Sequence, residues 1–137
     1  MEQSFFPEEG RWYRGNIHSH TTRTDGLCPP AQQIRDYSEQ GYDFLAITDH
    51  NVIDSHRLGE GLPICMIPGW ERDIRHCSDN TKCIHVVGLV PSPAQETPCR
   101  EARRCSCLEI PDQQLLDEMR SDGQFVVLAH PHWSRMT

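Results

Sequence analysis

Short apolar runs alternate along this chain with segments that have the periodicity of amphipathic helices. Such runs predict β-strands, and those without polar alternation are typical of strands buried on both faces. The predicted strands are residues 12–20, 44–48, 63–68, 84–90 and 125–129. Helices are predicted over residues 30–40, 54–60 and 111–121. For the first of these, Pro30 suits a first helical turn and Gly41 a helix end. This alternation predicts an α/β fold built on a mostly parallel sheet.

Two polar, punctuated stretches interrupt the pattern at residues 72–83 and 91–107. Their composition predicts loops. Because predicted strands resume after each stretch, we interpret neither as a linker between domains. The length of 137 residues is that of one ordinary domain, so a single domain is expected over residues 1–137.

Composition and charge narrow the classes of function. Hydrophobic residues make up 36% and charged residues 24% of the chain, as in globular proteins. No apolar run approaches the ~20 residues of a membrane span, and the N-terminus lacks a secretory pattern, so a cytoplasmic protein is expected. The net charge of −7 argues against a general nucleic-acid or membrane-surface binder. An anionic substrate would need positive charge from another source, and 8 histidines make metal ions the candidate.

Side chains that can bind metal occur on or at the end of every predicted strand. His18 and His20 lie at i and i+2, a spacing that points both to one face of a strand. The later strands bring His50, Glu71, His85 and His130. Because the carboxyl ends of parallel strands meet at one edge of a sheet, we expect these groups to converge. Imidazole and carboxylate ligands suit Zn²⁺, Mn²⁺ or Fe²⁺, so the pattern predicts a polynuclear metal site.

The same residues form motifs that resemble a known family. The stretches are NIHSHTTRTDG, AITDHN, GWE, HVVGL and LAHPH, in that order, over residues 16–132. Their order and spacing resemble the PHP family, the polymerase and histidinol phosphatase domain. The resemblance implies a distorted (β/α)7-type barrel. It also implies two or three divalent ions, zinc, manganese or iron, in a site that hydrolyses phosphate esters by means of metal-activated hydroxide.

The resemblance also implies roles for individual residues. The implied metal ligands are His18, His20, Asp25, His50, Glu71, His85 and His130. Glu71 is expected to bridge two ions. Among the candidate catalytic residues, Asp49 is expected to orient the neighbouring His50, while His132 and Arg135 are expected to contact the substrate phosphate.

Several of these residues have an alternative interpretation. Asp25 precedes a glycine and is equally typical of a turn. Asp49 follows a strand, where an aspartate often caps a helix. His132 and Arg135 are equally typical of a solvated chain end.

Other notable side chains lie outside the roles above. We interpret Trp70 as part of the core, whereas Trp133 suits either a core or the wall of a substrate pocket. His56 and His76 have no motif around them and are expected at the surface. The 7 cysteines include no C-x-x-C pair and are expected to be scattered reduced thiols.

The chain has no Asp-x-His pair after its LAHPH segment, whereas members of the family normally carry one there. We therefore expect a barrel that is incomplete at its C-terminal end, with an open sheet edge that allows self-association. The leading hypothesis is hydrolysis of a small phosphomonoester or nucleotide, since no basic, aromatic track suits a long nucleic acid. The alternatives are a metal-binding, non-catalytic module that needs a partner or further strands, and a zinc-binding adaptor dependent on Cys105 and Cys107.

Overall fold

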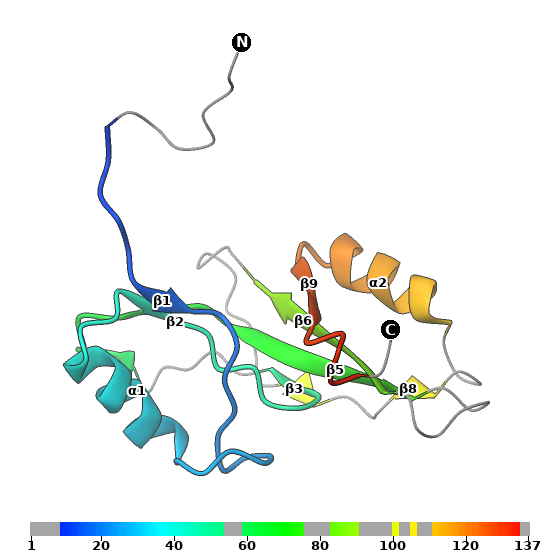
Figure 1. Cartoon of the computed structure of the whole chain (residues 1–137), viewed down its shortest axis with the longest axis horizontal. Helices are drawn as coiled ribbons and strands as arrows, with labels where there is room; N and C mark the ends of the chain where they lie inside the picture. The colour runs from blue at the N-terminus through cyan, green and yellow to red at the C-terminus, as the bar shows by residue number, and fades with distance from the viewer. Residues whose placement is uncertain are drawn as a thin grey trace.

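The computed structural model describes residues 9–53, 59–75, 83–90, 100–101, 105–106 and 111–134. In these residues the two larger sheets lie side by side, each with one helix packed against it (Figure 1), and a third sheet consists of two short antiparallel strands, residues 52–53 and 100–101. The elements are β1 (Gly15–Asn16), α1 (Pro30–Glu39), β2 (Phe44–Leu45), β3 (Val52–Ile53), β4 (Cys65–Met66), β5 (Gly69–Arg75), β6 (Cys83–Leu89), β7 (Arg100–Glu101), β8 (Cys105–Ser106), α2 (Asp112–Ser121) and β9 (Phe125–Ala129). The fold is therefore a mixed α/β fold.

The first sheet is short and parallel, in the order β1-β2-β4. Helix α1 covers it, because Ile34 of the helix is buried with Leu45 and Ile47 in one apolar cluster. Regular pairing ends early, but the backbone of Thr48 still donates a hydrogen bond to Ser19 O at 2.7 Å. The ends of β1 and β2 therefore continue side by side as irregular chain.

Helix α1 confirms the predicted helix, whereas the predicted strands of this half are shorter than expected. The strand expected over residues 12–20 is reduced to β1, and Trp12 and Tyr13 before it are exposed. The strand expected over residues 63–68 is reduced to β4, whose flanking prolines limit backbone pairing.

The second sheet has the order β8-β5-β6-β9. The pairs β5–β6 and β6–β9 are antiparallel, and only β5–β8 is parallel. The prediction of a mostly parallel sheet is therefore wrong for this half. Only residues 76–82 separate β5 from β6, and a parallel crossover needs about a dozen residues or more. The predicted loop over residues 72–83 is also wrong at its start, because β5 runs on to Arg75.

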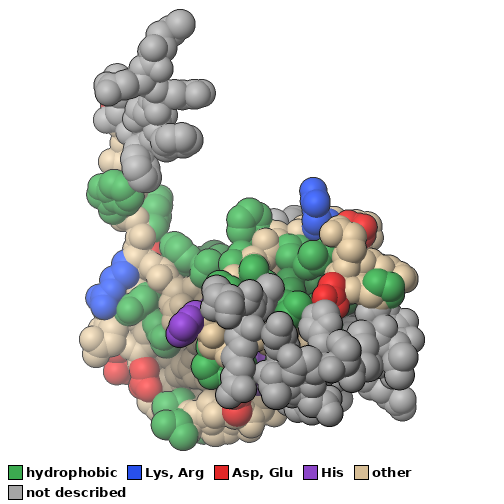
Figure 2. Space-filling view, turned by 45° about the vertical axis from the view of Figure 1, so that its right-hand side comes forward, with side chains coloured by type: hydrophobic (Ala, Val, Ile, Leu, Met, Phe, Trp, Pro, Cys, Tyr) green, Lys and Arg blue, Asp and Glu red, His purple; other side chains and the backbone are tan. Residues whose placement is uncertain are grey.

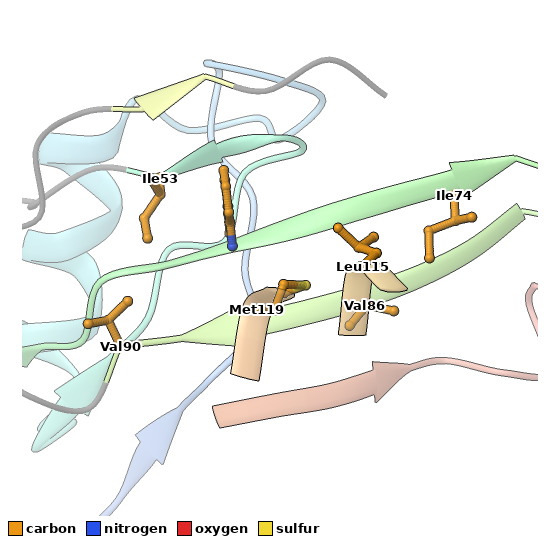
Figure 3. Close-up of a cluster of buried hydrophobic side chains, with 7 residues drawn as sticks. Ile53, Ile74, Val86, Val90, Leu115 and Met119 are labelled. Carbon is orange, nitrogen blue, oxygen red and sulfur yellow. The ribbon is translucent and has the colours of Figure 1, made fainter. Parts of the chain in front are cut away.

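Helix α2 packs on one face of the second sheet. In Figure 3 the side chains of Ile74 and Val86 from β5 and β6 meet Leu115 and Met119 from α2. Side chains alternate along a strand, so Glu71 on β5 points away from this core, toward the opposite face. The apolar packing of α2 thus fixes which face of the sheet carries the polar groups.

The two sheets are joined where the first one ends. His50 forms an isolated parallel bridge with Glu71, in which Asn51 N donates to Glu71 O at 2.7 Å and Glu71 N donates to Asp49 O at 3.2 Å. The chain that follows β2 therefore runs directly into contact with the start of β5. This joint places the irregular ends of the first sheet over the polar face of the second.

The remaining elements complete the comparison with the sequence. Helix α2 and strand β9 confirm the elements predicted over residues 111–121 and 125–129. Strands β7 and β8 fall within the stretch 91–107, which was predicted to be loop. Most of the helix predicted over residues 54–60 lies outside the described residues. The (β/α)7 barrel and the single-domain boundary stay predictions.

Strand β9 has a single neighbour, β6, among the described residues. Its Phe125 and Leu128 are exposed. Self-association through this edge stays a prediction.

Among the residues with assigned positions, no helix is both long and apolar enough to cross a lipid bilayer.

Candidate metal centre

Two histidines, His18 and His20, follow β1 with their ring centroids 5.0 Å apart. His18 Nδ1 lies 2.7 Å from Thr48 Oγ1, and this contact holds the ring with Nε2 3.5 Å from Glu71 Oε1. His20 lies between two carboxylates, with Nδ1 2.8 Å from Asp25 Oδ1 and Nε2 3.0 Å from Glu71 Oε2. The i, i+2 spacing therefore brings both imidazoles to Glu71, as expected.

The loop that carries Asp25 is held by the buried carboxylate of Asp49. Asp49 Oδ1 accepts hydrogen bonds from Thr21 N at 2.8 Å and Thr24 Oγ1 at 2.7 Å, and Oδ2 accepts one from Thr21 Oγ1 at 2.6 Å. Asp25 lies in a turn, and its carboxylate faces His20, so the two interpretations are compatible. Its role as a metal ligand stays a prediction. The helix-cap interpretation of Asp49 is wrong, since strand β3 follows it closely.

His50 lies between the two halves of the centre. Its Nδ1 is 2.6 Å from Asp73 Oδ1, and its Nε2 is 3.4 Å from Asp25 Oδ2. The hydrogen bond with Asp73 raises the pKa of His50 above its ordinary value, although burial opposes this. His50 therefore connects the carboxylate of the loop to a carboxylate of the second sheet.

Glu71 is the centre of the cluster, and none of its surface is exposed. The shortest distances from imidazole nitrogens to its carboxylate oxygens are 2.9 Å for His130, 3.0 Å for His20, 3.1 Å for His85, 3.3 Å for His50 and 3.5 Å for His18. Burial favours a raised pKa for Glu71, but the contacts with His20 and His85 outweigh it and hold that pKa far below its usual range. The carboxylate is therefore ionised inside a protein interior.

Sequence reasoning missed Asp73, which belongs to the same cluster. Asp73 is 1% exposed and stands opposite His85 in the register of β5 and β6. Its signal was the i, i+2 spacing from Glu71, which places both carboxylates on one face of a strand. The signal was overlooked because this part of β5 was predicted to be loop.

His130 enters the centre directly after β9, where its positive φ of 25° turns the chain away from the strand direction. Trp133 follows in the next turn, with its ring centroid 5.2 Å from that of His130 and 5.1 Å from that of His85. Trp133 is 65% exposed, so it stands at the mouth of the centre. Trp70, by contrast, is buried in the core, which confirms its interpretation.

These side chains line one pocket of about 370 Å³. Its lining consists of His18, His20, Asp25, His50, Glu71, His85, His130 and Trp133. The structure thus brings together all seven side chains that the resemblance connects with metal. Figure 2 shows a histidine side chain at the surface on one face of the molecule, next to apolar side chains.

Other predicted site residues lie elsewhere. Asp49 is buried behind the loop rather than in the pocket lining, which suits a positioning role. His132 is exposed and does not belong to the lining. Arg135, His56 and His76 fall outside the described residues.

Three of the cysteines lie in the described part of the chain with their side chains. Cys28, Cys65 and Cys83 are not joined in disulfides, which agrees with the expectation of reduced thiols. The side chains of Cys105 and Cys107 fall outside the described part of the chain, so the adaptor hypothesis stays a prediction.

The donor atoms fit divalent metal ions. Three groups of ligand atoms each lie within 4.8 Å of one another: His18, Glu71 and His130; His20, His50 and Glu71; and His50, Asp73 and His85. Glu71 Oε2 and His20 Nδ1 are buried without a hydrogen-bond partner, although oppositely charged atoms lie close to each. Such atoms approach one another without aligning as donor and acceptor, which is the arrangement expected when they face a shared cation.

Charge supports the same interpretation. With neutral imidazoles the cluster holds the three negative charges of Asp25, Glu71 and Asp73 in a small volume. Burial lowers the pKa of His18 and so favours the neutral ring that binds metal, whereas contacts with carboxylates raise the pKa of His20 and His50. Divalent cations would balance the carboxylates and make the pocket attractive to an anion.

The sequence and the structure were compared with those of known proteins. No protein-family model matches the sequence. The chain is 35% identical, over 103 aligned residues, to the 5'-3' exoribonuclease Rnm of Salmonella typhimurium strain LT2. That alignment covers 64% of this chain and 34% of the relative, so the chain spans about a third of the length of the curated relative it matches.

Two solved structures are similar to this one. A two-domain protein from Bacteroides vulgatus, which contains a predicted PHP-like metal-dependent phosphoesterase, aligns with a TM-score of 0.59 at 20% identity. The alignment covers 88% of this chain and 36% of that one. A protein from Bifidobacterium adolescentis, assigned as a metal-dependent phosphoesterase, gives 0.49 at 22% identity and covers 64% and 31%. The Bacteroides structure shows that this chain shares the fold of a protein described as PHP-like, in agreement with the resemblance seen in the sequence.

Proposed function

We propose that this chain, with its PHP-like sequence motifs and fold, holds two or three divalent metal ions and hydrolyses phosphate esters. The observation that carries the proposal is the buried carboxylate of Glu71, which lies within 3.5 Å of nitrogens from five histidines. A structural ion pair needs one such partner. Five partners around one carboxylate are typical of a polynuclear metal centre.

The ligand groups suggest how the ions would be held. Glu71 belongs to two of the three groups and would bridge the ions that they bind. His18 and His130 would complete one position, and His20 and His50 the other. When bound, divalent ions lower the pKa of water toward ~7 and neutralise the oxygens of a phosphoryl group.

The remaining residues prepare this site. Thr48 fixes the ring of His18, and Asp49 fixes the loop that presents Asp25 to His20. The loss of a residue that holds a metal ligand in place in this way typically lowers metal affinity or activity by about 10–100-fold. The chain therefore orients its donors before any substrate arrives.

For the substrate we propose a nucleotide or the terminal nucleotide of RNA. The pocket of about 370 Å³ has the size of a small-molecule site, and the exposed indole of Trp133 at its mouth offers a surface on which a base can stack. The 35% identical relative is a 5'-3' exoribonuclease, which supports the choice of nucleotide chemistry. The acidic chain gives little support for contacts along a long strand.

The test is hydrolysis by the purified protein after loading with Mn²⁺ or Zn²⁺. Substrates are a nucleoside 5'-monophosphate, a 5'-phosphorylated oligoribonucleotide and a simple aryl phosphate. We expect metal-dependent release of phosphate or nucleotide that is lost in Glu71→Gln and retained in Glu39→Gln, a control at the exposed end of α1. Metal bound at the expected stoichiometry with no turnover of any substrate would instead support the non-catalytic module.

A further inference from the structure

We infer that Asp73, Cys83 and His85 form a further cation site at the outer edge of the metal centre, which prefers Zn²⁺ and other thiophilic ions. We call these three residues the outer site. Cys83 carries no role in the hydrolysis proposed above, whereas Asp73 and His85 also belong to one of its three candidate ligand groups. The inference holds whether or not that hydrolysis occurs.

The strand register brings the three side chains to one place. Asp73 and His85 are paired across β5 and β6, and Cys83 lies two residues before His85 on the same strand. Side chains at i and i+2 share a face, so Cys83 and His85 both point to the face that carries Asp73. They line a second pocket of about 520 Å³, which adjoins the first through Asp25 and His50.

The ring of His85 has its two nitrogens in different surroundings. Nδ1 lies 3.1 Å from Glu71 Oε1, and Nε2 lies 3.2 Å from Cys83 Sγ and 3.9 Å from Asp73 Oδ1. When Nδ1–H donates to the ionised Glu71, the lone pair of Nε2 faces the outer site. A ligating histidine typically donates its other ring N–H to a carboxylate in this way.

The distance between the sulfur of Cys83 and the imidazole of His85 suits a common ion. A tetrahedral zinc ion has bonds of about 2.0 Å to nitrogen and about 2.3 Å to sulfur, which places those two atoms about 3.5 Å apart. The observed separation of 3.2 Å between Cys83 Sγ and His85 Nε2 is close to this value. Three protein ligands leave the fourth position open toward the pocket, as in catalytic rather than structural zinc sites.

Asp73 is positioned for this role by its neighbour. Its Oδ1 accepts a hydrogen bond from His50 Nδ1 at 2.6 Å, and the residue is 1% exposed. An oriented, buried carboxylate beside a thiol and an imidazole favours a dication over a proton alone. Sulfur makes the outer site softer than the three groups of nitrogen and oxygen donors, so Zn²⁺, Co²⁺ and Cd²⁺ should prefer it over Mn²⁺.

The first experiment titrates the metal-free protein with Co²⁺ and records the sulfur-to-cobalt charge-transfer absorption. We expect this absorption in the natural chain, and we expect Cys83→Ser to remove the part due to one thiolate. Cys65→Ser, at an exposed cysteine on β4, serves as the matched control and should retain all of it. Cys105→Ser combined with Cys107→Ser should also retain it. Absorption that is unchanged in Cys83→Ser would overturn the inference.

The second experiment uses the unaltered chain, so it does not depend on the folding of a variant. Cysteines are alkylated with iodoacetamide at a Zn²⁺ concentration about ten times the dissociation constant, which leaves about a tenth of the sites empty. Peptide mass spectrometry should then show Cys83 reacting about tenfold more slowly than without zinc, while Cys65 reacts at the same rate. Equal rates for Cys83 with and without zinc would show an ordinary thiol–imidazole contact and overturn the outer site.

The contribution of Asp73 is tested by Asp73→Asn, which keeps the size of the side chain. We expect the zinc affinity of the outer site to fall by about 10–100-fold. At saturating Co²⁺ the sulfur-to-cobalt charge-transfer absorption should reach the value of the natural chain. Zinc affinity that equals that of the natural chain would remove Asp73 from the ligand set.

Discussion

The parallel sheet and the antiparallel sheet supply the metal centre in different ways. In the parallel half, His18, His20 and Asp25 lie beyond the regular strand β1, and hydrogen bonds to Thr48 and Asp49 hold the chain that carries them. In the antiparallel half, the polar groups stand within strands or directly after one, and a continuous ladder between β5, β6 and β9 sets their spacing.

The comparison shows two kinds of dependence on the rest of the protein. A group on a ladder is fixed by backbone hydrogen bonds and by the apolar core on the other face of the sheet. A group in a loop is fixed by a few side-chain hydrogen bonds, each of which a single substitution removes. The two halves should therefore fail differently, the first by losing ligand geometry and the second by losing stability of the fold.

The largest effect is expected where the halves meet, at Glu71. Glu71→Gln keeps the size of the side chain but removes the charge that lies between the imidazoles of both halves. We expect the two positions that share Glu71 to lose metal, and phosphoesterase activity to fall by about 10³-fold or more, since electrostatic stabilisation is the main catalytic contribution of such a site. Metal content by elemental analysis and turnover under saturating Mn²⁺ provide the measurement.

A second measurement on the same variant distinguishes lost charge from damage to the fold. The far-ultraviolet circular dichroism of Glu71→Gln should match that of the natural chain, because the backbone hydrogen bonds of Glu71 to the chain after β2 do not involve its side chain. Full metal content in this variant would contradict the idea that one carboxylate unites the halves.

The next effect concerns the loop half alone. Asp49→Ala removes the acceptor of three hydrogen bonds from Thr21 and Thr24 and leaves the buried Thr21 N–H without its partner. We expect a loss of about 1–3 kcal/mol in the free energy of unfolding. Metal affinity at the position that uses His20 should fall by 10–100-fold as an order of magnitude. Denaturant unfolding and metal titration measure the two quantities separately.

Asp49→Asn provides the matched control, because its carbonyl oxygen can still accept from Thr21 N while the hydroxyl of Thr21 reorients. Recovery of most of the metal affinity by Asp49→Asn would support a positioning role. Equal loss in both variants would instead indicate that the negative charge of Asp49 acts on the ions directly.

The sequence predicts the content of the centre better than the arrangement of the strands. His18, His20 and His50 were found from their positions at the ends of predicted strands, and that logic is correct for the parallel half. Glu71 was found by the same logic, although it lies within β5 of the antiparallel half. His85 was found for a reason that does not apply to it: it lies near the start of β6 and reaches the pocket because β6 runs antiparallel.

Asp73 and the sheet direction were missed for one shared physical reason. The stretch after Glu71 contains alternating charged residues, a pattern that suits both a loop and a strand with one polar face. Only the long-range pairing of β5 with β6 distinguishes a loop from a strand here, and the local composition does not indicate such pairing. The bounds of strand β9 and helix α2, whose apolar residues form local patterns, were predicted almost to the residue, although Phe125 and Leu128 of β9 are exposed rather than buried.

A smaller effect, confined to the antiparallel half, is expected at Gly88. A Cβ atom there would lie 2.1 Å from Gln124 Oε1 and 2.5 Å from Met119 Cε, on the face that packs against α2. Gln124 would have to shift and lose the buried hydrogen bond that Trp70 Nε1 donates to it at 2.9 Å. We expect Gly88→Ala to cost about 1–2 kcal/mol in unfolding free energy, with metal affinity of the folded protein unchanged.

The control for this position combines Gly88→Ala with Gln124→Ala, which makes room for the new methyl group. The effects of the two substitutions on the unfolding free energy should be non-additive, because the side chain of Gln124 both obstructs the new methyl group and accepts the hydrogen bond from Trp70. A fall in metal affinity with no change in stability would contradict the separation of the two faces.

The smallest effect is expected at the mouth of the pocket, at Trp133. Trp133→Ala removes an exposed ring from beside His85 and His130 but leaves every proposed metal ligand in place. If a nucleobase stacks on the indole, KM for a nucleotide should rise by roughly fivefold, the equivalent of about 1 kcal/mol, while KM for an aryl phosphate without a base and kcat for both stay the same. Trp133→Phe, which keeps a flat ring, should recover part of the loss. An equal rise in KM for both substrates would show that Trp133 supports His130 in the antiparallel half rather than the substrate.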